Sequence, residues 1–267
     1  RLKVDAKRPL SFVRSAKENL TIDEQREMFG LLGQLNRAAG IKYPEDKELQ
    51  ARIKSYELAF QMQSTVPEVM NFQQESKSVQ SLYGIDQSAT KAFGEKCLAA
   101  RRLAERGVRF IQLFHGYTGS AGAWDSHLDI KGRHSKLAKQ VDQPIAGLIK
   151  DLKQRGLLDE TLVVVGSEFG RTPGAEVRAG STAAKATGRD HHPHGFNVVM
   201  AGGGVKPGIV HGATDELGFH AAEDRHYVTD LHATVLHQLG LDTRQLEVPG
   251  RKRLDRDFGE VMHKILG

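Results

Sequence analysis

The chain has 267 residues, of which 39% are hydrophobic and 27% charged, as is typical of a globular protein. Its single cysteine excludes an intrachain disulfide and a zinc site built from cysteines. The net charge of +5 is spread along the chain without an aromatic and basic module, and no apolar run approaches the roughly 20 residues that span a bilayer. We therefore expect no nucleic acid partner and no membrane span, whereas a mild positive charge suits an anionic substrate.

The first part of the chain predicts helices. A capping-box pattern at Thr21 begins a helix whose apolar residues recur at helical spacing up to Gly40. A second helix begins near Pro44, and a third is expected over about 87–106. We expect residues 1–106 to form a helical region that packs on the rest of the chain, because they contain no catalytic motif and no histidine.

After residue 106 the pattern changes to strands that alternate with helices. Three apolar, β-rich runs are typical of buried strands: 107–114, 161–165 and 196–200. Two helices are expected between and after them: about 134–155 and 230–239. This order predicts an α/β domain over 107–267 with a parallel sheet, which together with the helical region would form one structural domain.

Ligands of parallel α/β sheets bind beyond the C-terminal ends of the strands, and the polar clusters of this chain lie in such loops. Asp125 and His127, one residue apart in the loop after the first strand, can both point at one ion if the loop turns locally. Carboxylate and imidazole donors suit Zn or Mn, and oxygen-rich sites suit Mg or Ca. Taken alone, this pair is explained as well by a surface loop with a capping Asp.

A second cluster follows the strand over 161–165. Glu168 comes directly after this apolar run, where a carboxylate is costly unless it is solvated, paired or bound to a cation. Arg171 could pair with Glu168 or hold a substrate anion through two hydrogen bonds. A structural ion pair and a metal site are both open interpretations.

The third cluster is the densest, because it places one carboxylate and three imidazoles within a few residues. Its members are Asp190, His191, His192 and His194, preceded by Arg189. Neutral imidazole is a common metal ligand, and a carboxylate beside it can fix its tautomer. We expect Asp190 and His191 to bind metal, Arg189 to hold an anion, and His192, His194 and the strand-end His115 to support the ligands.

Five motifs in one order resemble a known family from about Arg102 to the C-terminus. They are WDSH, TLVVVGSEFGRTP, GRDHHPHGFNVVMAGGGV, GATDELGF and DLHATVLHQLGLD. They resemble the domain of unknown function 1501 family, which is grouped with the superfamily of alkaline phosphatase, sulfatase and cofactor-independent phosphoglycerate mutase. Residues 1–100 resemble the variable helical middle of the same family.

The resemblance implies a parallel-sheet core of alkaline-phosphatase/sulfatase type and a metal site of that superfamily. Asp125 and His127 resemble ligands of one ion, and His191 or a neighbour resembles the late His that completes its shell. Glu168 stands where the superfamily has the Asp of a strand-Asp-His-Gly motif. Phe169 replaces the His of that motif, which puts a second ion in doubt.

The resemblance also implies a missing region. The superfamily places a metal-binding Asp and a Ser, Thr or Cys nucleophile ahead of its helical middle, and no such segment occurs here. We therefore expect this chain to be the C-terminal part of a longer protein, and its nucleophile is not identifiable. Full members resemble exported proteins with a twin-arginine leader, which implies a periplasmic or secreted location.

Two hypotheses from different classes follow. The first is a metal-dependent hydrolase acting on phosphate or sulfate esters of small molecules or polysaccharides, with divalent Zn, Mn, Ca or Mg. Its metal ligands would be Asp125, His127, Glu168, Asp190 and His191, and its anion-binding residues Arg171 and Arg189. The alternative is a catalytically inactive binding or scaffold module that retains the fold, which the missing nucleophile and Phe169 favour.

Overall fold

A computed structural model describes residues 22–42, 46, 48–55, 66, 68–116, 124–167, 169–176, 187–247 and 257–267. The chain divides into two compact units, Arg1–Gln74 with Glu247–Arg253 and Glu75–Leu246 with Leu254–Gly267. Within the first unit lie α1 (Ile22–Lys42), a helical segment over 48–55 and η1 (Phe72–Gln74). Helix α1 confirms the helix predicted to end near Gly40. Across the described residues, no helix combines the length and apolar character that crossing a membrane requires.

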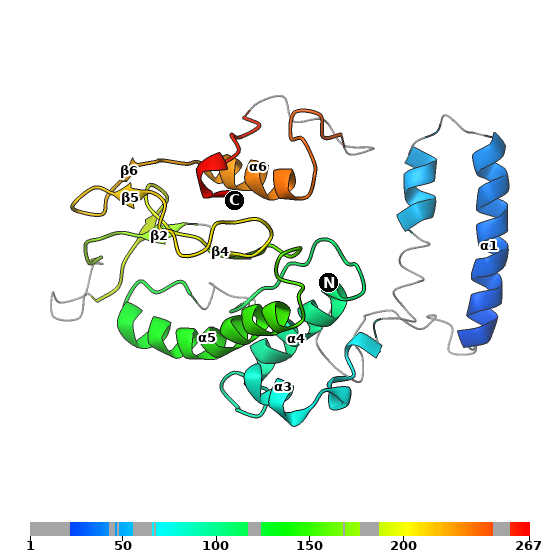
Figure 1. The fold of residues 1–267 in the computed structure, drawn as a ribbon, viewed down its shortest axis with the longest axis horizontal. Helices are drawn as coiled ribbons and strands as arrows, with labels where there is room; N and C mark the ends of the chain where they lie inside the picture. Colours follow the sequence, from blue (N-terminus) through cyan, green and yellow to red (C-terminus); the bar gives the residue numbers. More distant parts are fainter. Residues whose placement is uncertain are drawn as a thin grey trace. The chain divides into compact units, whose positions relative to one another are not determined.

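The second unit, most of whose helices and strands are labelled in Figure 1, contains the polar clusters predicted from the sequence. Its helices are α3 (Lys77–Leu82), α4 (Lys91–Ala104), α5 (Ile130–Gln154), α6 (Val228–Gln238) and the 3-10 helix η3 (His263–Ile265). Its strands are β1 (Val163–Val165), β2 (Gly170–Arg171), β3 (His191–His192), β4 (Val199–Ala201), β5 (Ala213–Thr214) and β6 (Ala221–Glu223). Helices α3 and α4 lie within residues 1–106, which were expected to form a helical region, but they belong to the same unit as the strands.

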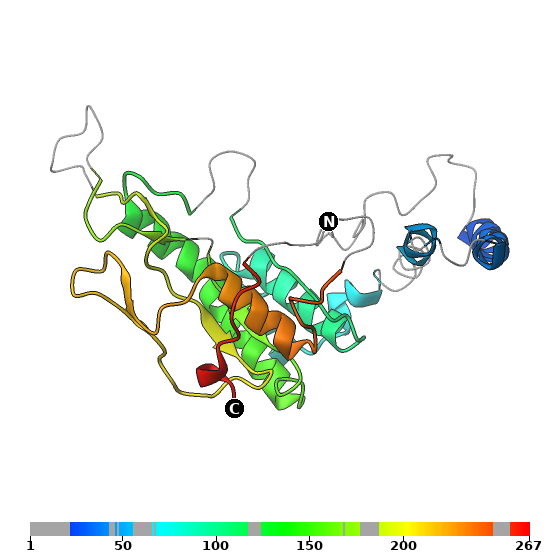
Figure 2. The ribbon, with the colours of Figure 1, turned by 90° about the horizontal axis from the view of Figure 1, so that it is seen from above.

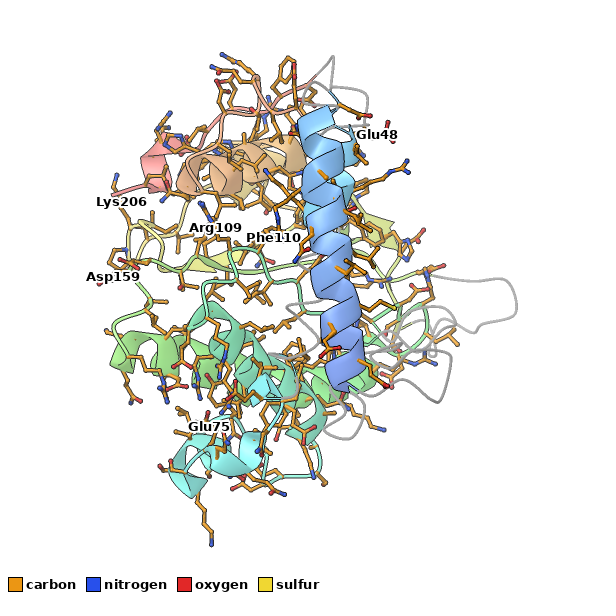
Figure 3. All side chains as sticks on the ribbon, turned by 90° about the vertical axis from the view of Figure 1, so that its right-hand side faces the viewer. Glu48, Glu75, Arg109, Phe110, Asp159 and Lys206 are labelled. Atoms are coloured by element: carbon orange, nitrogen blue, oxygen red, sulfur yellow. The ribbon has the colours of Figure 1, made fainter. Side chains whose placement is uncertain are left out.

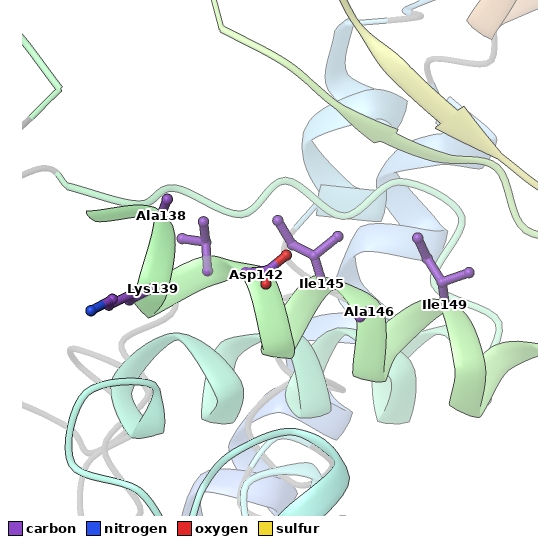
Figure 4. A pocket seen from close by; sticks show the side chains of 7 residues that line it. Ala138, Lys139, Asp142, Ile145, Ala146 and Ile149 are labelled. Atoms are coloured by element: carbon purple, nitrogen blue, oxygen red, sulfur yellow. The ribbon is translucent and has the colours of Figure 1, made fainter. Parts of the chain in front are cut away.

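Helix α5 is the longest element of this unit, and its ends are set by local chemistry. The side chain of Asp129 accepts a hydrogen bond of 2.9 Å from the backbone N–H of Gly132, which satisfies a free donor at the N-terminus. At the other end Gly156 adopts φ +70°, and Leu157 N–H donates to the Leu152 carbonyl at 2.8 Å. This left-handed glycine cap confirms the predicted stop. Ile145 and Ile149 project from one side of α5 (Figure 4) and help to line a shallow groove that contains none of the predicted site residues.

Helices α4 and α5 pack side by side and form the core of the unit (Figures 1 and 2). Cys97 and Leu98 on α4 and Leu152 on α5 are buried. Gly94 on α4 and Gly147 on α5 allow the connection between α3 and α4 to pack closely against both of these helices. A Cβ at Gly147 would lie 2.5 Å from the Leu82 carbonyl oxygen, and one at Gly94 would lie 2.2 Å from that of Tyr83. Neither position has room for a side chain.

A buried ion cluster joins α4 to α5. Asp151 of α5 and Arg101 of α4 have side chains only 3% exposed, and their Oδ2 and Nε atoms lie 3.0 Å apart. Asp151 also accepts hydrogen bonds from the Tyr83 hydroxyl at 2.9 Å and from Arg155 Nε at 2.8 Å. Arg101 contacts Glu75 at 2.8 Å as well. Burial alone raises the pKa of Glu75, but hydrogen bonds from Arg101 and Arg102 outweigh it and lower the pKa below its ordinary value.

The predicted parallel sheet of alkaline-phosphatase/sulfatase type is wrong. Each pair of strands that the structure describes is antiparallel and short: β1 with β4, β2 with β3, and β5 with β6. Val163 lies opposite Ala201, whereas Val164 and Val199 are 39% and 60% exposed. A continuous apolar run was interpreted as a strand buried on both faces, but here it is covered on one face only. The described architecture is therefore a mixed α/β arrangement of helices with small antiparallel pairs.

The strand predicted over 107–114 is also wrong. This segment has no regular secondary structure and belongs to none of the described strand pairs. Phe110 and Phe114 are 68% and 52% exposed, and the guanidinium of Arg109 donates to the Leu239 carbonyl at 3.0 Å (Figure 3). The β-rich composition of this run predicted a buried strand, whereas its large apolar side chains are exposed and it pairs with no described strand.

The ion cluster generates a stability prediction. Asp151→Asn removes a buried charge from opposite Arg101 and Arg155, and breaking a buried pair on one side costs about 3–5 kcal/mol. We expect the free energy of unfolding at neutral pH, measured by urea denaturation, to fall by that amount. Glu260→Gln is the control, because it removes an exposed ion pair to Arg244, with side chains 63% and 81% exposed, and such pairs contribute about 0–1 kcal/mol. Equal losses in the two variants would contradict this role for Asp151.

Candidate metal site

Three segments meet at the site. The loop over 124–129 precedes α5, the short strand β3 carries His191, and the segment over 187–190 leads into β3. Thr187 forms an isolated parallel bridge with Asp129, and Arg189 N–H donates to the Ser126 carbonyl at 3.3 Å. Backbone pairing therefore brings the first and third predicted clusters together, although 66 residues separate Asp125 from His191 in the chain.

Asp125 Oδ1 is the common acceptor of the site. His127 Nε2 and His191 Nε2 each lie 2.8 Å from it. Both terminal nitrogens of Arg171 lie 3.3 Å from the same oxygen. The hydrogen bond from His191, followed by that from Arg171, holds the pKa of Asp125 below its ordinary range despite partial burial. The carboxylate is therefore ionised at neutral pH, and its contribution to stability disappears only when the pH falls through this lowered pKa.

His127 lies between two carboxylates. Its Nε2 faces Asp125, and its Nδ1 lies 2.6 Å from Glu176 Oε2 and 3.9 Å from Asp190 Oδ1. A neutral imidazole carries one N–H and cannot donate to both acceptors, so one nitrogen would face a carboxylate with its lone pair. One of these two contacts therefore lacks a proton on the imidazole, and a metal cation can take its place.

Two groups of side chains have ligand atoms close enough to share an ion. Asp125, His127 and His191 form one group, and His127, Glu176 and Asp190 form the other, with all ligand atoms of a group within 4.8 Å of one another. Because the two groups use different nitrogens of His127, one ion cannot occupy both. Ligand atoms around a tetrahedral zinc lie roughly 3.3–3.5 Å apart, so contacts of 2.8 Å would open by a few tenths of an ångström.

A glycine allows the two backbone segments to approach this closely. A Cβ at Gly188 would lie 1.9 Å from both the carbonyl carbon and the carbonyl oxygen of His127. No L-amino-acid side chain fits at this distance. The absence of a side chain at Gly188 therefore permits the contact between the loop that carries His127 and the segment that carries Asp190.

Both predicted anion-binding arginines are engaged by the protein. Besides Asp125, Arg171 donates to the carbonyls of Trp124 at 2.7 Å and Arg189 at 3.2 Å. Arg189 donates to the Thr172 carbonyl at 2.7 Å and also to that of Pro173. These contacts orient Asp125 and fix the loop after β2. A role in holding substrate stays a prediction for both arginines.

The predicted supporting histidines lie in other environments. His115 Nδ1 accepts from the Trp124 indole at 3.0 Å, which leaves its proton on Nε2, 3.0 Å from Gln140 Oε1. Burial lowers the pKa of His115, so it is a neutral structural group behind the loop. His192 Nε2 lies 2.5 Å from the Phe219 carbonyl, and the His194 ring lies 5.4 Å from that of His220. Glu168 lies outside the described residues.

The comparisons with known proteins identify a family. The sequence model of a family described as "Protein of unknown function (DUF1501)" matches residues 3–266. The chain belongs to the DUF1501 family. No curated protein and no solved structure matched the chain.

One member of the site in this DUF1501 protein was missed from the sequence. Glu176 lies in a loop without any metal-ligand spacing, and it reaches His127 because its backbone forms an isolated antiparallel bridge with Gly188. No local pattern marks such a bridge. Phe169, which was noted as a substitution for His, places its ring 4.4 Å from that of His191 and so packs against a ligand candidate.

The packing at Gly188 generates a prediction. Gly188→Ala should push the segment over 187–190 away from His127, with a loss of about 1–3 kcal/mol in unfolding free energy and a weaker zinc affinity. Gly174→Ala is the matched control in a neighbouring loop, because nothing lies within 4 Å of a Cβ there. Urea denaturation and calorimetric zinc titration of the two variants would measure both effects. Equal behaviour of the two variants would show that the close approach is unimportant.

Proposed function

We propose that this DUF1501 protein is a metal-dependent hydrolase related to the alkaline phosphatase and sulfatase superfamily, acting on phosphate or sulfate esters. The observation that carries the proposal is the convergence of Asp125, His127 and His191, with each imidazole Nε2 within 2.8 Å of one carboxylate oxygen. The superfamily relationship is supported by the order of the motifs that contribute these residues.

The donors favour a particular class of ion. Two imidazole nitrogens and one carboxylate oxygen suit Zn²⁺ or Mn²⁺ better than Mg²⁺ or Ca²⁺, which prefer oxygen ligands. Three protein ligands with a remaining position open to solvent is the pattern of catalytic zinc sites, and the His191 side chain is 43% exposed. When bound, such an ion would polarise an ester oxygen and stabilise the charge that develops during displacement.

The residues of this chain would support that chemistry by positioning the ligands. Arg171 compensates Asp125 and fixes its orientation through the Trp124 carbonyl, while Glu176 would hold His127 through Nδ1 so that Nε2 is free for the ion. His191 is oriented by its ring contact with Phe169. Each ligand of the first group therefore has a partner that restricts its motion, which is what a preorganised site requires.

A second candidate function is a catalytically inactive module in which the ion stabilises structure. One observation favours it: Ser126, the hydroxyl residue between the two ligands Asp125 and His127, is fully buried and so is not exposed to a substrate. The two functions predict the same metal site and differ only in turnover.

The proposal predicts a metal site that depends on these ligands. The protein should bind zinc or manganese, measured by elemental analysis and calorimetry. Asp125→Asn and His191→Gln should weaken binding by more than the roughly 10–100-fold that loss of a supporting residue costs. His194→Gln is the control, because its ring faces His220. Unchanged metal affinity in both ligand variants would refute the site.

Turnover separates the two functions. The metal-loaded protein should hydrolyse members of a panel of aryl phosphate and sulfate esters, and Asp125→Asn should abolish that activity. Metal uptake that raises the unfolding midpoint without hydrolysis of any ester would instead establish the structural module.

A further inference from the structure

A second pair of imidazoles converges away from the ligands described above. His211 precedes β5 and His226 follows β6, and the pairing of Ala213 with Glu223 places these flanking residues at the same end of the strand pair. His211 Nε2 and His226 Nε2 lie 2.9 Å apart, with ring centroids separated by 5.1 Å and ring planes inclined by 29°. Each Nε2 therefore points at the other.

A carboxylate lies behind each ring. His211 Nδ1 is 3.8 Å from Asp224 Oδ2, and His226 Nδ1 is 3.5 Å from Asp230 Oδ2. Asp230 is fixed, because its oxygens accept the backbone N–H groups of Tyr227 and Glu260 at 2.9 and 2.8 Å. Asp224 also pairs with Lys264, which holds this carboxylate in place behind the His211 ring.

The two carboxylates have a consequence for the protons of the imidazoles. At 3.8 and 3.5 Å neither carboxylate accepts a hydrogen bond from Nδ1, but its negative charge favours the tautomer with the proton on Nδ1, which leaves the lone pair on Nε2. With both rings in that tautomer, two lone pairs face each other at 2.9 Å and repel unless a cation lies between them. A carboxylate behind one nitrogen and a free lone pair on the other is also the usual setting of metal-bound histidine.

We propose that His211 and His226 form a second metal site, which binds a divalent ion of the Zn²⁺, Ni²⁺ or Cu²⁺ class through the two Nε2 atoms, with water in the remaining positions. Imidazole donors select this class over Mg²⁺ and Ca²⁺. Binding of Zn²⁺ would separate the two nitrogens from 2.9 Å to roughly 3.3 Å. The side chains are 16% and 31% exposed, so an ion can enter from solvent.

The ion would join two elements that are otherwise weakly connected. β5 and β6 pair over only a few residues, with an irregular register at Ala213 and Thr214. His226 lies directly before α6, so a bridge from His211 to His226 ties the strand pair to the N-terminal end of that helix. This site shares no residue with the proposed hydrolase site and does not depend on it.

The test is a zinc titration of the full chain by calorimetry and elemental analysis. We expect two equivalents for the unsubstituted protein, one equivalent for His211→Gln and for His226→Gln, and two for His220→Gln. His220 is the matched control, because its Nδ1 also faces a carboxylate, Asp215 at 3.5 Å, and its side chain is 66% exposed. Asp125→Asn should lose the other equivalent and keep the one bound by His211 and His226, so the two sites fail separately.

Circular dichroism and the unfolding midpoint of the metal-free variants show whether each variant remains folded. Zinc should raise the unfolding midpoint of Asp125→Asn, but it should not raise that of the double variant Asp125→Asn with His211→Gln. In the Asp125→Asn background, electron paramagnetic resonance of one equivalent of Cu²⁺ should show nitrogen ligation that His226→Gln removes. Zinc uptake by Asp125→Asn that is unaffected by His211→Gln and His226→Gln, or no uptake by that protein, would overturn the proposal.

Discussion

The contact between Arg101 and Asp151 is the constraint on which the second unit depends. Both side chains are almost fully buried, and burying two charges is favourable only when their remaining hydrogen-bonding groups are also satisfied. Tyr83 and Arg155 supply those contacts to Asp151, so the connection before α4, α4 itself and α5 are fixed by one carboxylate. The N-terminus of α5 begins directly after the loop that carries Asp125 and His127. The position of the candidate metal site therefore follows from the anchoring of α5 near its other end.

The candidate site uses charge differently from the helical core. In the helical core the buried carboxylates of Glu75 and Asp151 face guanidinium groups, which are always protonated. At the site His127 faces a carboxylate at each nitrogen, and a neutral imidazole satisfies only one of them. This difference separates a structural cluster from one suited to a cation, although both are dense in charged side chains.

The helices of this chain are more predictable from the sequence than its strands, for a physical reason. Helix α5 has local determinants in its apolar spacing, in the capping Asp129 and in Gly156. The partner and direction of β1 depend on contacts with β4, more than 30 residues away, which periodicity does not encode. The candidate site was partly predictable, because Asp125, His127, Asp190 and His191 are chemically conspicuous and do meet. Glu176 was not, since only a backbone bridge brings it to His127. The pair of His211 and His226 has no local signal in the sequence, because 15 residues separate its two members.

Both imidazole clusters lie beside strand pairs that are short. In β2 and β3, Gly170 pairs with His192 and Arg171 pairs with His191. β5 and β6 pair with a register irregularity. Two-stranded pairs of this length form few hydrogen bonds and are marginal on their own. Side chains that converge on an ion cross-link such segments, and the free energy of ion binding then becomes free energy of folding. Metal binding at either cluster would accordingly be coupled to the order of these segments whether or not the first cluster also hydrolyses esters. Turnover is therefore the property that separates an enzyme from a metal-stabilised binding module.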